Sequence, residues 1–305
     1  MHGNAKVFVL MAAMTALVMA LGWMLGGQGG AVMALVLAGG MNVFSWWNSD
    51  KMVLRQQGAV ELSPQQGGEL YALTADLARR ADLPMPKLYL LPTQQPNAFA
   101  TGRNPGNSAV ALTQGLVSSL SRDEIAGVIA HELAHIKHRD TLTMTVTATL
   151  AGAIAMMGNM MLFAGGRDGR GGGLGAILAM IFAPLAAMLV QMAISRAREY
   201  EADATGAQIS GQPQALASAL ARIAQMAGRT LNIPAERNPA AASLFIVNPL
   251  NGLRMDSLFA THPPTEERIA RLMALSGGSG HMAERASPIP RSGGAAQDDG
   301  PWGRG

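Results

Sequence analysis

SRDEIAGVIAHELAH, at residues 121–135, is the stretch of this 305-residue chain that says most about its fold. Ser121, followed three residues later by Glu124, is typical of a capping box at the start of a helix. Apolar residues then recur at helical spacing, as at Ile125 and Val128, which predicts one buried face. We therefore expect a helix that packs on a core and carries the polar residues near its end into the interior.

His131, Glu132 and His135 are those polar residues. His131 and His135 lie one helical turn apart, with β-carbons about 6 Å from each other, so both imidazoles can converge on one ion. Zinc binds neutral imidazole nitrogens at about 2.0–2.1 Å. Glu132 is displaced by about 100° around the helix, which leaves its carboxylate close to a water held by the metal. This is the His-Glu-x-x-His pattern of zinc peptidases with glutamate as general base, whereas burying these groups without partners would cost several kcal/mol.

Charged residues, 14% of the chain, are unevenly distributed. Three stretches contain none of them: Val7–Ser49, Thr141–Gly166 and Gly171–Ser195. A membrane span needs about 20 apolar residues, and the glycines at 26–30 offer a turn within the first stretch. We predict four spans: Val7–Leu25, Ala31–Trp47, Leu142–Phe163 and Leu174–Ile194.

Two other interpretations of these stretches stay open. The first could be a cleaved signal peptide, although one lysine precedes it and a second apolar run follows at once. The last two could form a buried helical hairpin inside a soluble domain. Threonine at every second position from 141 to 149 weakens the third span in particular.

The distribution of Lys and Arg around the spans predicts their orientation. With the N-terminus inside, seven basic residues flank the inner ends: Lys6, Lys51, Arg55, Lys137, Arg139, Arg196 and Arg198. Only Arg167 and Arg170 fall in the outer loops. We therefore expect the region between the second and third spans, and everything after the fourth, to face the cytoplasm.

The composition excludes several classes of function. The chain has no cysteine, which rules out disulfides, a thiol nucleophile, a cysteine zinc site and an iron–sulfur cluster. Its net charge of +3 and the lack of a basic block give no support for a nucleic-acid partner. A third metal ligand must therefore be histidine or a carboxylate.

The stretch Ser195–Asp203, SRAREYEAD, supplies the candidates for that ligand. Glu199 and Asp203 share one face of a predicted helix, so one could bind the metal while the other accepts the N–H of a ligating histidine. An exposed charge cluster would have the same spacing. The two predicted spans between His131 and Glu199 favour the metal site, because they return the chain to the same side of the membrane.

HELAH at 131–135 and SRAREYEAD at 195–203, with two apolar segments before and two between, resemble the HtpX family of membrane metalloproteases, which is related to the CAAX prenyl proteases. PNAFATG at 96–102 and THPPTEERI at 261–269 are also similar to family segments, and the resemblance covers roughly residues 1–275. It implies one zinc ion per chain, held by His131, His135 and Glu199, with Glu132 as base. It further implies a gluzincin-like catalytic domain on the cytoplasmic side of a bacterial inner membrane, clearing damaged membrane proteins under stress.

The remaining residues predict a mainly α-helical fold with a small β-sheet. Strands are expected at 87–91 and 109–113, with a turn at 102–107, and helices at 213–227 and 265–275. A strand edge beside the zinc could pair with an extended peptide, and Asn97 could anchor that peptide, although a turn asparagine would also stand there. His262 is a candidate to stabilise the oxyanion on the reacting carbonyl. A histidine without a functional role is an equally open interpretation.

These predictions give a domain order in which membrane and catalytic segments alternate. The expected segments are two spans at 1–48, the first catalytic part with the zinc helix at 49–140, two spans at 141–195, the second catalytic part with the third ligand at 196–275, and a disordered tail at 276–305. The expected function is a zinc endopeptidase acting on proteins of the lipid bilayer. A prenyl-type protease with a narrow substrate, or a scaffold or chaperone with a structural zinc, are the alternatives, and the oligomeric state is not indicated.

Overall fold

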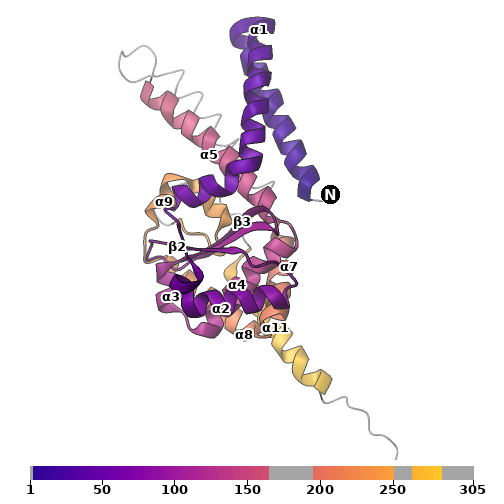
Figure 1. Cartoon of the computed structure of the whole chain (residues 1–305), viewed down its shortest axis with the longest axis vertical. Coiled ribbons are helices and arrows are strands. Elements are labelled where there is room, and N and C mark those ends of the chain that lie inside the picture. The colour runs from indigo at the N-terminus through magenta and orange to yellow at the C-terminus, as the bar shows by residue number, and fades with distance from the viewer. Residues whose placement is uncertain (1–2, 165–194, 251–262, 284–305) are drawn as a thin grey trace, which may run out of the picture.

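The computed structural model describes residues 3–164, 195–250 and 263–283. A helical hairpin and the helix α5 stand on one side of a rounded domain, and the last helix leaves the opposite side (Figure 1). The helices and strands are α1 (Gly3–Gln56), β1 (Val60–Glu61), α2 (Pro64–Arg80), β2 (Lys87–Leu91), β3 (Ala98–Asn104), β4 (Asn107–Thr113), α3 (Gln114–Ser119), α4 (Arg122–Lys137), α5 (Thr141–Ala164), α7 (Arg196–Ser210), α8 (Pro213–Ala227), α9 (Ile233–Arg237), the 3-10 helix η1 (Pro239–Leu244) and α11 (Thr265–Ala283).

The hairpin is formed by the two arms of α1, which meet at a break in the helix. Gly27 has φ 58° and ψ −143°, a conformation open to glycine and strained for residues with a β-carbon. This confirms the turn predicted in the glycine run, and the arms cover the first two predicted spans. Within the described parts of the chain, one helix, Gly26–Gln56, is long and apolar enough to cross a membrane, and Val7–Ala20 is a shorter apolar helix.

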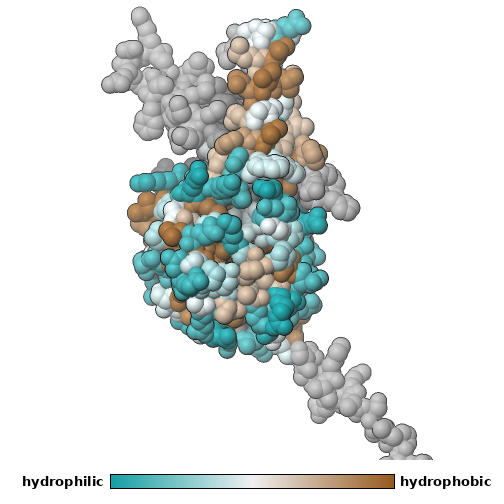
Figure 2. Space-filling model, in the orientation of Figure 1, coloured by the Kyte–Doolittle hydropathy of each residue, from teal (hydrophilic) through white to brown (hydrophobic). Residues whose placement is uncertain are grey.

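Large apolar side chains cover the outside of the second arm, among them Val36, Leu37 and Phe44 (Figure 2). Such a surface is costly in water and suits the interior of a bilayer. The third predicted span lies within α5, and the fourth, at 174–194, falls outside the described residues. The total of four spans therefore stays a prediction.

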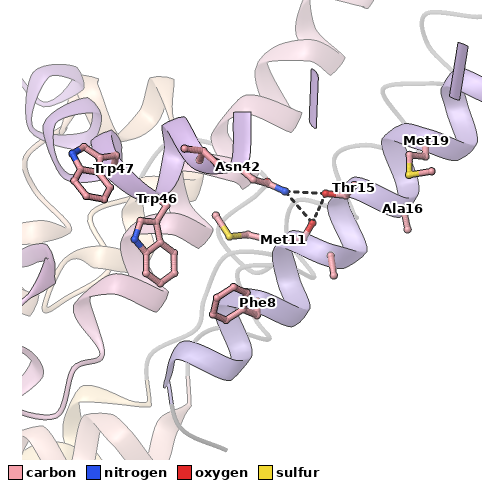
Figure 3. Close-up of a pocket in the computed structure, with 10 residues that line it drawn as sticks. Phe8, Met11, Thr15, Ala16, Met19, Asn42, Trp46 and Trp47 are labelled. Carbon is pink, nitrogen blue, oxygen red and sulfur yellow. Dashed lines mark hydrogen bonds between the residues drawn. The ribbon is translucent and has the colours of Figure 1, made fainter. Parts of the chain in front are cut away.

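Between the two arms lies an apolar cavity of about 610 Å³, with Phe8, Met11 and Trp46 in its lining (Figure 3). The side chain of Asn42 reaches across it and donates a hydrogen bond to Thr15 Oγ1 at 2.8 Å. Pairing of these two polar groups removes most of the cost of placing them between apolar helices.

Four strands of the described residues form one mixed sheet, in the order β1-β2-β4-β3. β2 runs parallel to β4, while β3 runs antiparallel to β4, with Phe99 opposite Ala111. The strands expected at 87–91 and 109–113 are confirmed as β2 and the last part of β4. β3 was not predicted, because its sequence AFATGRN is poor in the β-branched and aromatic residues that signal a strand.

The sheet separates two apolar cores. Val110 and Leu112 point to a core shared with α2, α4, α7 and α8, whereas Ala109 and Ala111 point to a second core shared with α1, α5 and η1. This follows from the alternation of side chains along a strand. One face of the sheet thus supports the helices that carry the metal motif, and the other rests on the roots of the apolar helices.

Two threonines of α5 form hydrogen bonds to β3 in the second core. Thr145 shares a hydrogen bond with Thr101 of β3 at 2.9 Å, and Thr141 donates to the carbonyl oxygen of Gly102 at 3.0 Å. The polar start of α5 therefore belongs to the domain, which accounts for the threonine run that weakened the predicted third span.

Two other predicted helices are present, with one changed boundary. The predicted helix at 213–227 is α8, whose apolar face packs on α4. The helix expected at 265–275 is α11, which continues to Ala283 into the tail predicted as disordered. The extension contains Gly277, Gly278 and Gly280, which disfavour a helix, and this is why the sequence did not predict it as helical.

The helix α4 begins with the capping box that the sequence predicted. Ser121 Oγ accepts the backbone N–H of Glu124 at 3.3 Å, and Glu124 accepts the backbone N–H of Ser121 at 2.8 Å. Glu124 also accepts hydrogen bonds from Ser218 and Arg222 of α8. The cap therefore fixes both the start of α4 and its position against α8.

We predict that Ser121→Ala destabilises the domain by about 1 kcal/mol, the usual cost of losing a helix cap. For a domain of this size the midpoint of thermal unfolding should fall by about 2–4 °C. The matched control is Ser118→Ala, because among the described residues the Ser118 hydroxyl bonds only to Gly115 of its own helix. Equal midpoints for Ser121→Ala and the control would contradict a stabilising role for the cap.

Candidate metal centre

Two histidines of α4 face each other in the interior of the domain. The Nε2 atoms of His131 and His135 are 3.2 Å apart, and the two rings meet edge to face with their centroids 4.8 Å apart. Both residues are at most 4% exposed. The one-turn spacing of α4 therefore produces the convergence of imidazoles that the sequence predicted.

Glu199, from the first turn of α7, completes this group. Its carboxylate oxygens lie 3.8 Å from His131 Nε2 and 3.6 Å from His135 Nε2, and all three donor atoms fall within 4.8 Å of one another. Ligands at about 2.0–2.2 Å from a tetrahedral ion would be roughly 3.3–3.5 Å apart. The spacing and chemistry of the three donors thus fit one divalent cation with an open fourth position.

Glu199 reaches the histidines because α7 packs very closely on α4. A β-carbon on Gly206 would lie 2.9 Å from both the Cα and the backbone nitrogen of His131. Real contacts of a β-carbon are almost never so short, so a larger residue would push α7 away. The missing side chain at 206 therefore helps to set the distance between the ligands of the two helices.

Asp203, one turn after Glu199, holds the far side of His131. Its Oδ1 lies 3.0 Å from His131 Nδ1, and both of its oxygens accept hydrogen bonds from Arg268 of α11 at 2.8 Å. Arg268 also donates to the carbonyl oxygen of Ile246 at 2.8 Å. A carboxylate in this position selects the His131 tautomer whose Nε2 lone pair points at the metal site.

A second carboxylate lies behind His135. Asp140 Oδ2 is 3.5 Å from His135 Nδ1, and Asp140 Oδ1 accepts a hydrogen bond from Arg198 Nη1 at 2.6 Å. The carboxylates of Glu132, Asp140, Glu199 and Asp203 outnumber the two arginines of the centre by two when the histidines are neutral. A divalent cation would balance that difference.

Glu132 lies beside β3, with a side chain that is 2% exposed. Burial raises the pKa of Glu132 to about 7; the positive charge of His135 opposes this rise, and the negative charge of Glu199 adds to it. Its Oε1 atom has no hydrogen-bond partner within the described residues. Glu132 is therefore a carboxylate that can take up or release a proton near neutral pH.

The two histidines differ in charge before an ion binds. Burial lowers the pKa of His131 to about 4 despite the nearby carboxylate of Asp203. Burial also disfavours the charged form of His135, but Glu199 and Asp140 outweigh it and raise its pKa to about 9. Burial likewise opposes ionisation of Asp203, yet Arg268 and His131 lower its pKa to about 2. At neutral pH, His131 is thus ready to bind a metal, whereas His135 must first lose a proton.

The other predicted site residues have different positions. Asn97 is fully buried; its Nδ2 donates to the carbonyl oxygen of Val247 at 2.8 Å, and its Oδ1 accepts the N–H of Ala98 at 3.1 Å. These bonds hold the segment around Val247 against β3, and contact of Asn97 with a substrate stays a prediction. His262 lies outside the described residues. His138, three residues after His135, lies with its Nε2 3.3 Å from the hydroxyl of Thr205.

Arg268 and Asp140 were not recognised from the sequence. Arg268 lies in the segment THPPTEERI, 137 residues after His131. Nothing in the spacing of that segment shows that the two residues are close in the fold. Asp140 stands five residues after His135, just before an apolar run. An acidic residue in that place could have signalled a partner for the second histidine.

Comparison with known proteins identifies the part of the chain that contains this centre. A sequence model described as peptidase family M48 matches residues 64–276, which include all the residues of the centre. Among solved structures, the crystal structure of S. mikatae Ste24p is similar, at 20% sequence identity and a TM-score of 0.47. The match covers 88% of this chain and 64% of that chain, so this chain spans less than two thirds of the length of Ste24p.

We predict that the affinity for Zn²⁺ rises steeply with pH, because the ion must displace the proton that His135 holds up to a pKa of about 9. Between pH 7.5 and 9 the apparent dissociation constant should fall by about tenfold per pH unit, and above pH 9 it should level off. Competition with a chromogenic chelator would measure it. The control His138→Gln should keep the same slope, and a flat profile would contradict a protonated ligand.

Proposed function

The chain belongs to peptidase family M48, a family of metallopeptidases, and we propose that it is a membrane-anchored zinc endopeptidase. The observation that carries this proposal is the convergence of His131, His135 and Glu199 within 4.8 Å, next to the buried carboxylate of Glu132. In this proposal the three converging residues hold one zinc ion. Its site is assembled from residues 49–140 and 196–275, on either side of the apolar region at 141–195.

When bound, zinc would polarise the scissile carbonyl and acidify a water molecule. Glu132 acts as the general base: it takes a proton from the attacking water and passes it to the leaving amine. Burial raises the pKa of Glu132 and so makes its carboxylate a stronger base than an exposed one. Asp203, fixed by Arg268, keeps the proton of His131 on Nδ1, so that Nε2, which lies 3.5 Å from Arg268 Nη2, keeps its lone pair for the metal.

β3 is the edge strand that supports binding of an extended substrate. Two carbonyl oxygens of β3 already have partners: that of Ala98 accepts the N–H of Ile246, and that of Gly102 accepts the hydroxyl of Thr141. Ala100, between them, lies beside Glu132. We propose that a substrate backbone adds to β3 at Ala100, which places a peptide bond at the zinc without reading side chains and so allows broad specificity.

The proposed substrates are damaged or misfolded proteins of a bacterial inner membrane, in a stress-related quality-control role. The exposed apolar arm of α1 supports a membrane location, and the excess of basic residues at the predicted inner span ends supports a cytoplasmic catalytic domain. A bilayer would then hold the domain close to membrane-protein substrates. His262 is retained as a proposed oxyanion-stabilising residue and Asn97 as a proposed substrate contact.

We predict that Glu132→Gln keeps bound zinc but lowers kcat on a membrane-protein substrate by about 10²–10⁴-fold, the usual contribution of a general base. Glu199→Ala should instead lose the metal, as measured by elemental analysis of the purified protein. Glu201→Gln is the matched control, because Glu201 is exposed on the same helix as Glu199.

Two results would contradict these assignments. Normal cleavage by Glu132→Gln would remove Glu132 as the base, and full zinc occupancy in Glu199→Ala would remove Glu199 as a ligand. A strict requirement for a C-terminal tripeptide would favour a prenyl-type protease. A fourth protein ligand on the zinc would favour a structural site in a scaffold or chaperone, since structural zinc sites are closed.

A further inference from the structure

Each histidine of the metal centre is backed by its own pair of an aspartate and an arginine. Behind His131 stand Asp203 and Arg268, with hydrogen bonds of 2.8 Å between them. The corresponding pair behind His135 consists of Asp140, which follows α4, and Arg198 of α7, joined by a hydrogen bond of 2.6 Å. The function proposed above does not use this second pair.

The Nδ1 atom of His135 and the Oδ2 atom of Asp140 face each other at 3.5 Å. Both atoms are buried, and neither has a hydrogen-bond partner elsewhere in the described residues. A buried imidazole nitrogen and a buried carboxylate oxygen are each costly to leave unpaired. A small movement of either side chain satisfies both, with Nδ1 of His135 as donor.

The backbone is shaped to return Asp140 to this position. Arg139 adopts the left-handed conformation, with φ 60°, which is unfavourable for a residue with a long side chain. The turn lets the N–H of Asp140 donate to the carbonyl oxygen of His135 at 3.0 Å. Its own carbonyl oxygen then accepts the N–H of Met144 in the first turn of α5. Asp140 thus bonds to the end of α4 and to the start of α5, and its side chain faces the proposed ligand His135.

Arg198 fixes the other side of the Asp140 carboxylate. It immediately precedes Glu199 in the first turn of α7, so the same turn supplies a proposed ligand and the clamp on Asp140. Because one carboxylate oxygen is held by Arg198, the other cannot rotate away from His135. The clamp also joins the start of α5 to the start of α7, the two ends of the region predicted to enter the membrane.

We propose that Asp140, held by Arg198, is a positioning residue for His135: it keeps the proton of His135 on Nδ1 and thereby directs Nε2 at the metal. The inference rests on the proposed function, because it takes His135 as a metal ligand. Partners of this kind orient metal-bound histidines, and their removal costs about 10–100-fold in metal affinity or activity. A plain ion pair between α5 and α7 would stabilise the fold and leave the metal unaffected.

The test measures the metal itself in the full-length protein in detergent. Asp140→Asn should raise the dissociation constant for Zn²⁺ by about 10–100-fold and alter the visible absorption bands of the Co²⁺-substituted protein. Its kcat should fall while KM stays unchanged. Arg198→Met should act in the same direction with a smaller effect, and Arg198→Lys should restore the wild-type values, because lysine can still hold the carboxylate.

Matched controls come from the same helices. Asp123→Asn and Arg196→Met replace exposed residues in the first turns of α4 and α7, and both should keep the wild-type affinity and spectrum. Wild-type zinc affinity and an unchanged Co²⁺ spectrum in Asp140→Asn would overturn the proposal. If Asp140→Asn does not fold, the spectra of Arg198→Met and Arg198→Lys decide in its place. Failure of the wild-type protein to bind zinc would instead overturn the proposed function.

Discussion

The close packing of α7 on α4 is the constraint on which the rest of the structure depends. The two helices touch where Gly206 lies against the backbone of His131, and this contact sets Glu199 within reach of both histidines. Most of the remaining architecture supports that contact. The capping box holds α4 against α8, the sheet supports α4 from one side, and Arg268 of α11 fastens Asp203 of α7.

Such packing brings many ionisable groups into one buried place, and their charges must balance. With neutral histidines, the carboxylates of the centre exceed its arginines by two, which a divalent ion would neutralise. Without an ion, bound protons neutralise part of this negative charge, because the pKa of His135 rises to about 9 and that of Glu132 to about 7. The same charges that make the site attractive to a cation therefore make it basic in the cation's absence, so metal binding and proton release are linked.

Short-range patterns in the sequence were enough to predict the helix of the histidines, because a cap and a one-turn spacing are local properties. Glu199 required a longer argument from the number of predicted spans, and the structure brings it to His131 and His135. Arg268 was not predicted because its role arises only when α11 meets α7. Asp140 was not predicted although it stands only five residues after His135. The strand β3 was not predicted for a different reason. Ala98, Ala100 and Gly102 have little preference for a strand, and pairing with β4 gives them that conformation.

β3 also connects the metal centre with the apolar helices. Ala100 packs in the core below α4, and its backbone contacts Glu132, whereas the neighbouring Thr101 points to the opposite face and bonds to Thr145 of α5. At the other end of the same region, Asp140 joins the helix of the histidines to α5 and is tied to α7 through Arg198. A displacement of α5 would therefore be transmitted to Glu132, the proposed general base, through β3, and to His135 through Asp140. In the proposed membrane-anchored enzyme, the position of the apolar helices would therefore affect the geometry of the metal centre.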